Sequence, residues 1–336
     1  MRVGINYPWI NYDWDFGIPP RGWGARAAWR SRLQRDLEGF RDLGIFAVRW
    51  WVLGSGLLYG VGRNAPRLAR TSWQVPAVPQ LPREIVEDFA AALPYFRRAN
   101  IKLMPVFCDY KMFFAGEMTN TTGYVKSGRQ ELISDAVKRG QFLRNALRPL
   151  LAACRGFEDL IYAWDLCNEP EWCVRNGGAG VPTDRRATLE LPAMLAFLRE
   201  GVVMINLAGF RSTIGFNHRT TVDAWGSIGL QVRLHQCHYY PHNEFLPRHT
   251  FSPEYPLIIG EFPSALYRPW PALAAAETRD ASDRLLRRLR HLQSLGYPDA
   301  FIWSAQEPAP TPEGTDLQAV AWDEAARRQL RQFSGR

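Results

Sequence analysis

Residues 160–170 read LIYAWDLCNEP, an apolar run that ends in Asn168, Glu169 and Pro170. The run 160–166 has the length of a β-strand and shows little of the polar and apolar alternation of a half-exposed strand. Continuous apolar runs of this kind are typical of parallel strands that are buried on both faces. The sequence therefore predicts a buried parallel strand that ends at polar side chains.

Seven further apolar runs of strand length lie along the chain, and stretches with helical spacing separate most of them. The eight expected strands are residues 3–6, 45–50, 101–107, 160–166, 212–216, 232–238, 257–260 and 300–303. The expected helices are residues 29–43, 82–98, 129–153, 189–207, 281–295 and 324–333. Eight strands with intervening helices predict an α/β fold, a (β/α)8 TIM barrel that occupies residues 1–336 as a single domain.

The least regular part of this pattern is residues 212–257, which must hold two strand–helix units with little room for full helices. We expect one short helix near residues 223–230 and an irregular connection at residues 242–254. A doubly wound open sheet is the alternative fold, but no Gly-x-Gly-x-x-Gly turn follows the first strand. Three connections are long, and in a barrel they emerge at the carboxyl-terminal face, where barrel enzymes build their sites. These connections are residues 52–82, 108–126 and 171–188.

The composition is that of an ordinary globular chain, with 46% hydrophobic and 22% charged residues. The formal net charge of +8 comes from 41 basic and 33 acidic residues, and the basic residues are mostly arginines scattered along the expected helices. They form no basic patch interleaved with aromatic residues, so a nucleic-acid partner is not expected. No apolar run reaches the roughly 18–20 residues of a membrane helix, so no membrane partner is expected either.

The five cysteines show no Cys-x-x-Cys spacing, and Cys108, Cys167 and Cys237 lie in apolar runs where cysteine acts as a small core residue. A disulfide framework is not expected, which favours a reducing compartment. Met1 is followed directly by a strand-like segment without the features of a signal peptide. We therefore expect a cytoplasmic protein for the chain as written, or a secreted one if a signal peptide was removed.

A second apolar run, YPLIIGEFP at residues 255–263, carries Glu261 near its end. Glu169 and Glu261 are 92 residues apart, which is about three strand–helix units of the roughly 31 residues that a 250-residue barrel implies. The two glutamates therefore follow the fourth and seventh strands and project into the same end of the barrel. A carboxylate there costs several kcal/mol to desolvate unless it is paired or faces a cleft.

Two carboxyl groups that face each other across a cleft are the catalytic groups that most glycosidases use to cleave a glycosidic bond. One must be protonated to supply a proton to the leaving oxygen, and the other must be ionised to attack or to activate water. Arg49, at the end of the second strand, is expected to keep Glu261 ionised, whereas Glu169 lies between Asn168 and the aromatic Trp172 and stays protonated longer. A strand-end ion pair or a helix cap explains one such glutamate equally well, but it explains the pair poorly.

The ordered set of the Asn-Glu-Pro at 168–170, the His-Tyr-Tyr-Pro at 238–241 and Glu261 resembles glycoside hydrolase clan A, and in particular family 5, the cellulase and mannanase family. The resemblance covers essentially the whole chain in element order. It implies a retaining β-glycoside hydrolase that acts on β-linked gluco- or manno-configured oligosaccharides or polysaccharides and requires no cofactor. It makes Glu169 the general acid/base and Glu261 the nucleophile.

The same resemblance implies several substrate-binding residues around this pair. Asn168 would hydrogen-bond the sugar 2-hydroxyl, and Trp303 would form the aromatic platform beneath the sugar. Arg49 would support the nucleophile. His238 and Tyr240 match a His-x-Tyr pair, with the tyrosine hydroxyl donating to the nucleophile.

The chain departs from the family at the end of the third strand, where members usually carry a histidine and this chain has Cys108, Asp109 and Tyr110. Asp109 is expected to replace that contact with a sugar hydroxyl. Trp172 follows Glu169 on a loop and is a candidate substrate-binding residue that lines the cleft. The aromatic stretch 7–16 either forms a sugar-binding wall or packs under the barrel rim.

Two other functions remain open. A carbohydrate-binding barrel without turnover would keep the cleft, although binding alone does not need a carboxylate pair. A metal-dependent hydrolase would need a ligand set, and no cluster in the sequence has convincing metal spacing. The sequence leaves open the sugar, the linkage, the oligomeric state and the choice between endo and exo action. The long connections favour exo action or short oligosaccharides.

Overall fold

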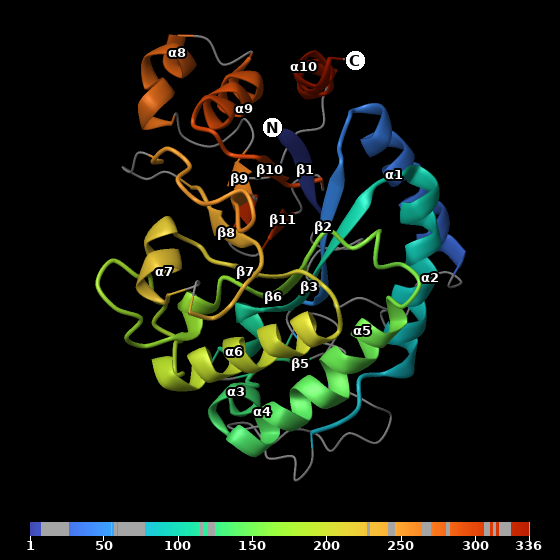
Figure 1. Ribbon diagram of the computed structural model, residues 1–336, viewed down its shortest axis with the longest axis vertical. Coiled ribbons are helices and arrows are strands. Elements are labelled where there is room, and N and C mark those ends of the chain that lie inside the picture. Colours follow the sequence, from blue (N-terminus) through green and yellow to red (C-terminus); the bar gives the residue numbers. More distant parts are fainter. Residues whose placement is uncertain are drawn as a thin grey trace.

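The computed structural model is an eight-stranded parallel sheet that curls into a barrel, with helices on its outside (Figure 1). The structure describes residues 1–7, 27–54, 56, 59, 78–114, 117–119, 125–226, 229–240, 246–263, 270–279, 283–305, 310–311, 314–315 and 324–335. The barrel strands are β1 (Arg2–Tyr7), β2 (Ala47–Leu53), β3 (Lys102–Asp109), β6 (Trp164–Asn168), β7 (Ser212–Gly215), β8 (His235–His238), β9 (Leu257–Pro263) and β10 (Asp299–Trp303). Their order in the sheet is β7-β6-β3-β2-β1-β10-β9-β8.

The two ends of this sheet meet between β7 and β8, which closes the barrel. Phe216 and Cys237 form a parallel bridge there. The backbone N–H of His238 donates to the carbonyl of Phe216 at 2.7 Å, and the N–H of Leu234 donates to the carbonyl of Ser212 at 3.0 Å. The predicted (β/α)8 barrel is confirmed, and each of the eight expected strands overlaps one observed strand.

Five of the six expected helices are present, with ends that differ by at most a few residues. They are α1 (Ala27–Asp42), α2 (Arg83–Ala99), α6 (Leu191–Leu207), α9 (Arg284–Ser294) and α10 (Glu324–Ser334). The sixth, expected at 129–153, is divided into α3 (Glu131–Ser134), α4 (Ala136–Phe142), a π turn η2 (Leu143–Leu147) and α5 (Arg148–Ala153). The division occurs because Asp135 is extended (φ −90°, ψ 120°) and its carboxylate caps α4 by accepting from the backbone N–H groups of Val137 and Lys138.

The short helix expected at 223–230 is α7 (Arg219–Ala224), which lies earlier in the chain. It begins after the extended His218 and cannot extend far beyond Trp225, because Gly226 turns the chain into the left-handed region at φ 62°. Residues 246–254, the described part of the expected irregular connection, form neither helix nor strand. The smaller elements are β4 (Glu117–Thr119), β5 (Val125–Ser127), β11 (Pro310–Thr311), β12 (Gly314–Thr315), α8 (Ala274–Arg279), and the turns η1 (Tyr110–Phe113), η3 (Pro170–Cys173) and η4 (Pro271–Leu273).

A layer of apolar side chains fills one level of the barrel, and a polar layer lies directly above it. The apolar layer is a separate buried cluster made of Ala47, Met104, Ala163, Leu234, Ile258 and Phe301. Because strand residues two apart face the same side, the next inward positions belong to Arg49, Asp165 and Gln236. Two glycines make room for these polar side chains: a Cβ at Gly215 would lie 2.6 Å from Arg49, and one at Gly260 would lie 2.5 Å from Gln236.

All five cysteines are buried free thiols. Among the described residues, no helix has the length and apolar character needed to cross a membrane.

Candidate active site

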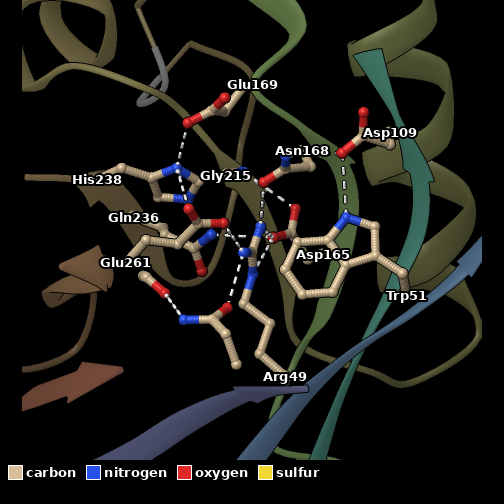
Figure 2. A network of polar contacts seen from close by, with 12 residues as sticks. Arg49, Trp51, Asp109, Asp165, Asn168, Glu169, Gly215, Gln236, His238 and Glu261 are labelled. Carbon is tan, nitrogen blue, oxygen red and sulfur yellow. Dashed lines mark hydrogen bonds and ion pairs between the residues drawn. The ribbon is translucent and has the colours of Figure 1, made fainter. Parts of the chain in front are cut away.

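The guanidinium of Arg49 is the centre of a polar network at the carboxyl ends of the barrel strands (Figure 2). Arg49 is fully buried and donates to Asp165 Oδ2 from Nε at 2.9 Å and from Nη2 at 2.7 Å. It also donates to Glu261 Oε1 at 2.5 Å, to Asn168 Oδ1 at 2.7 Å and to Asn6 Oδ1 at 3.0 Å. Two carboxylates and two amide carbonyls therefore compensate one buried positive charge.

The side chain of Asp165 is held in turn by groups from two neighbouring strands. Gln236 Nε2 donates to Asp165 Oδ2 at 2.9 Å, and the backbone N–H of Gly215 donates to Oδ1 at 2.9 Å. Since Asp165 is fully buried and both of its oxygens accept from protein groups, we assign it the task of fixing Arg49 rather than contacting a ligand.

Glu261 lies at the end of β9 with 4% of its surface exposed. Its Oε2 accepts from the hydroxyl of Tyr240 at 2.8 Å and lies 3.5 Å from His238 Nδ1, while Oε1 accepts from Arg49. The pairing between β8 and β9 shifts register between Cys237 and His238, so His238 pairs with Glu261. This irregularity turns Glu261 inward, where strict alternation from Ile258 would place only Gly260.

Glu169 follows β6 and lies in the left-handed region, with φ 47° and ψ 50°. Its Oε1 accepts from Asn217 Nδ2 at 2.7 Å and lies 2.8 Å from His238 Nδ1, and its Oε2 accepts from Trp172 Nε1 at 3.0 Å. Non-glycine residues rarely adopt this backbone conformation, which costs on the order of 1–3 kcal/mol and persists where surrounding contacts enforce it. The turn points the carboxyl towards Glu261 on the opposite wall.

Burial raises the pKa of both glutamates, and different neighbours oppose the rise. For Glu169 the amide of Asn217 acts first in lowering the pKa. For Glu261 a protonated His238 and the charge of Arg49 lower the pKa, and the hydroxyl of Tyr240 adds to this effect. Burial lowers the pKa of His238 to about 4, so this imidazole is neutral at neutral pH. The two carboxyl groups thus share a neutral histidine but differ in their other donors.

Asn168 is fixed at both ends of its amide. Its carbonyl accepts from Arg49, and its Nδ2 donates to Asp109 Oδ2 at 2.8 Å. Trp51 Nε1 donates to the same oxygen at 3.1 Å, and the backbone N–H of Lys111 donates to Asp109 Oδ1 at 2.9 Å. Asp109 is 3% exposed, so its visible task is to orient Asn168; its expected contact with a sugar hydroxyl stays a prediction.

The two tryptophans proposed for the cleft are half-buried. Trp303 ends β10 and packs edge-on against the buried Trp51, with ring centroids 5.6 Å apart. Trp172 lies on η3, donates to Glu169 and has its ring 6.4 Å from that of Tyr110. Of the aromatic stretch 7–16, residues 8–16 lie outside the described residues.

Several residues of this network were not predicted from the sequence. Asn6, Asp165 and Gln236 are polar residues within expected apolar strands, and that misfit is a signal that could have identified them. Asn217 offered no comparable signal, because it lies on a loop beyond β7 and reaches Glu169 only through the folded chain.

Within the described part of the chain, one group of possible metal ligands is compact. Single donor atoms of Glu169, His238 and Glu261 all lie within 4.8 Å of one another. Arg49 places a positive charge 2.5 Å from Glu261 Oε1, which opposes a cation at this position.

Replacing Arg49 with methionine is expected to lower the free energy of unfolding by about 3–5 kcal/mol, because Asp165 and Glu261 would become uncompensated buried charges. Urea unfolding followed by circular dichroism measures this loss. Arg97→Met is the control, since its ion pair with Asp159 is exposed and contributes about 1 kcal/mol or less. Equal losses in the two variants would contradict the role assigned to Arg49.

No protein-family model and no curated protein matches the chain. Among solved structures, it is similar to the β-mannanase of the blue mussel Mytilus edulis, with a TM-score of 0.65, 19% identity and coverage of 100% of this chain and 92% of that chain. An endo-1,4-β-mannanase from Eisenia fetida gives a TM-score of 0.65, 18% identity and coverage of 99% and 91%. The exo-β-1,4-mannosidase Op5Man5 from an Opitutaceae bacterium, strain TAV5, gives 0.62, 16% identity and coverage of 99% and 58%. The fold of the chain is the barrel of these enzymes.

Proposed function

We propose that the protein is a retaining β-glycoside hydrolase whose 336 residues form one catalytic barrel. The observation that carries the proposal is the pair of Glu169 and Glu261, which share His238 and have carboxyl oxygens within 4.8 Å of one another. Retaining enzymes place their two carboxyl groups about 5–5.5 Å apart, whereas inverting enzymes leave about 6.5–9.5 Å for a water molecule. The short separation supports double displacement.

In the first step, Glu261 attacks the anomeric carbon as the carboxylate. The bond from that carbon to the leaving oxygen breaks, and the proton of Glu169 passes to the leaving oxygen. Arg49 and Tyr240 donate to the two oxygens of Glu261, which keeps the nucleophile ionised and aligned. Asn168, whose amide is held by Arg49 and Asp109, is placed to meet the sugar 2-hydroxyl.

In the second step, Glu169 removes a proton from water, and the resulting hydroxyl attacks the anomeric carbon of the glycosyl-enzyme. The bond to Glu261 breaks, the nucleophile returns as a carboxylate and Glu169 is protonated again. Glu169 thus needs donors that stabilise its charged form for this step, and Asn217 and Trp172 supply them. No cofactor takes part in either step.

We expect a β-manno-configured substrate first and a β-gluco-configured one second. The support is the barrel's similarity to two β-mannanases and a β-mannosidase, together with Trp303 at the end of β10, where a ring can stack on the apolar face of a sugar. The long connections seen in the sequence favour short oligosaccharides or exo action. Endo and exo action are separated by comparing polymers with short oligosaccharides.

Hydrolysis of β-mannan, β-glucan and aryl β-mannosides and β-glucosides tests this function. We expect release of reducing sugar from a β-mannoside or mannan, with the β-anomer formed first in proton NMR spectra, and unchanged rates after treatment with EDTA. Loss of activity with EDTA would favour a metal-dependent hydrolase. Tight oligosaccharide binding without turnover would favour the carbohydrate-binding barrel.

A further inference from the structure

Two short segments, 169–171 and 215–217, are joined side by side at the rim of the barrel. The backbone N–H of Glu169 donates to the carbonyl of Gly215 at 2.7 Å. The backbone N–H of Asn217 donates to Glu171 Oε1 at 2.6 Å, and Asn217 Nδ2 donates to Glu169 Oε1 at 2.7 Å. Glu171 therefore holds the backbone of Asn217, and the side-chain amide of Asn217 holds Glu169.

Glu171 is fully buried, unlike most glutamates in proteins. Burial raises its pKa to about 8, although the backbone N–H groups around its carboxyl act in the opposite direction. Burying a carboxyl group destabilises the fold unless hydrogen bonds compensate for the lost contact with water. The carboxyl group of Glu171 interacts with its own backbone and with the side chain of Thr221. It also accepts from the backbone N–H of Asn217, two residues beyond the end of β7.

The side-chain amide of Asn217 donates to Glu169 Oε1, the same oxygen that lies next to His238 Nδ1. Asn217 on Oε1 and Trp172 on Oε2 together prevent the carboxyl group from rotating about its Cγ–Cδ bond. Asn217 is also the first of the groups that counter the effect of burial on Glu169. If the backbone of Asn217 moved, one of these two restraints would be lost.

We propose that Glu171 is a positioning residue, which anchors the backbone of Asn217 so that the Asn217 amide holds the carboxyl group of Glu169 in its working orientation. This inference rests on the proposed function, in which Glu169 is the acid/base, and extends it to two residues that touch no reacting atom of the substrate. Glu171 acts through Asn217, and Asn217 acts through Glu169.

Three variants test the chain of contacts. Glu171→Leu removes the acceptor, Asn217→Ala removes the amide, and Glu171→Gln keeps an oxygen that can accept from the backbone of Asn217. Asp88→Asn is the control, since Asp88 is a buried carboxyl group on α2, away from the network. Thermal unfolding of all four identifies any variant that fails to fold.

The first readout is the dependence of kcat/KM on the leaving group. A phenyl β-glycoside needs protonation of its leaving oxygen, whereas a dinitrophenyl β-glycoside does not. We expect Glu171→Leu and Asn217→Ala to lower kcat/KM about 10- to 100-fold for the phenyl substrate, which is part of the roughly 10²–10⁴-fold that general acid catalysis supplies. The dinitrophenyl substrate should change less than about 3-fold, and Glu171→Gln should stay near wild type on both.

The second readout needs no turnover. Carbon-13 NMR of labelled glutamate side chains follows the titration of Glu169, which is assigned with Glu169→Gln. Removing the Asn217 amide destabilises the carboxylate, so the pKa of Glu169 should rise in Asn217→Ala and Glu171→Leu but not in Glu171→Gln. Other charged and titratable groups also influence Glu169, and all of them except Glu171 are unchanged in the three variants. They are Arg49, Asp109, Tyr110, Lys111, Glu171, His238 and Glu261.

The two readouts separate the inference from the proposed function. If no glycoside is hydrolysed but the titration of Glu169 moves as described, the positioning role stands and the proposed function fails. An equal loss on phenyl and dinitrophenyl substrates, or an unmoved Glu169 titration in a folded Glu171→Leu protein, would overturn the positioning role. A loss in Glu171→Gln as large as in Glu171→Leu would also overturn it.

Discussion

Glu261→Gln is expected to lower kcat/KM on the best β-glycoside by about 10⁵-fold, the scale on which enzymes lose activity when the nucleophile of a covalent mechanism is removed. Glutamine keeps the size of the side chain and an oxygen that can accept from Arg49 or Tyr240. It removes the negative charge that attacks the anomeric carbon. Initial rates on the substrate that the panel identifies measure the effect, with a dinitrophenyl glycoside to extend the range.

A matched control exists on the outer layer of the barrel. Glu277 is fully buried and forms an ion pair with Arg288 at 2.8 Å, which resembles the pairing of Glu261 with Arg49. Glu277→Gln should therefore lower the stability of the fold about as much as Glu261→Gln does, but it should leave glycoside hydrolysis intact. A fluorinated sugar that traps the glycosyl-enzyme should add its mass to the wild type and to Glu277→Gln only. Equal, weak turnover in wild type and Glu261→Gln would remove Glu261 from the nucleophile's role.

The strands of the barrel were predictable because both faces of each strand are covered. Such strands read as continuous apolar runs, and eight of them were visible with helices between them. The positions of Glu169 and Glu261 followed from the same pattern, since parallel strands end at one rim. The shared rim was predictable, but the final approach of the two carboxyl groups also depends on the left-handed turn at Glu169 and on the register shift beside Glu261.

The directions of the side chains were harder to predict than the strands. Alternation from Ile258 points Gly260 rather than Glu261 into the barrel, and a register shift between β8 and β9 corrects this. A similar shift between Asp165 and Asn168 in β6 brings both side chains to Arg49. Bulges of this kind arise from the packing of neighbouring strands, so a single sequence carries little trace of them.

The contacts beyond the carboxylate pair depended on the folded chain. The expected contact of Asp109 with a sugar hydroxyl stays a prediction, whereas its bonds from Trp51, Asn168 and the backbone of Lys111 could not be predicted from the sequence. Asn217 could not be connected to Glu169 because the bond spans 48 residues between two loops. Sequence spacing identifies which strand ends meet, but it does not identify which loop side chains reach across them.

Glu169→Ala is expected to show an effect that depends strongly on the leaving group. With a phenyl β-glycoside, kcat/KM should fall by about 10²–10⁴-fold, because no group protonates the departing oxygen. With a dinitrophenyl β-glycoside the first step needs no acid, so the glycosyl-enzyme should form quickly and then accumulate, since no base activates water. A burst of dinitrophenolate followed by slow turnover is the expected time course.

The same variant predicts what an added nucleophile does. Azide is an anion and needs no base, and the missing side chain leaves room for it next to the anomeric carbon. Azide should therefore raise the slow turnover of Glu169→Ala, with a β-glycosyl azide as the product, and should leave Glu261→Gln unchanged. An α-glycosyl azide from Glu169→Ala, or rescue of Glu261→Gln alone, would mean that the roles of the two glutamates are exchanged.

The pH profile gives an independent check on Glu169. Activity requires Glu261 ionised, which holds above its pKa, and Glu169 protonated, which holds below its pKa. Burial raises both values, so the wild-type optimum should lie on the alkaline side of the ordinary carboxyl range. The alkaline limb belongs to Glu169, so it should be present in the wild type with the phenyl glycoside, which needs the acid. It should vanish in Glu169→Ala when kcat/KM is measured with the same phenyl glycoside, while the acid limb persists. An alkaline limb that survives in this variant would assign the acid to another residue.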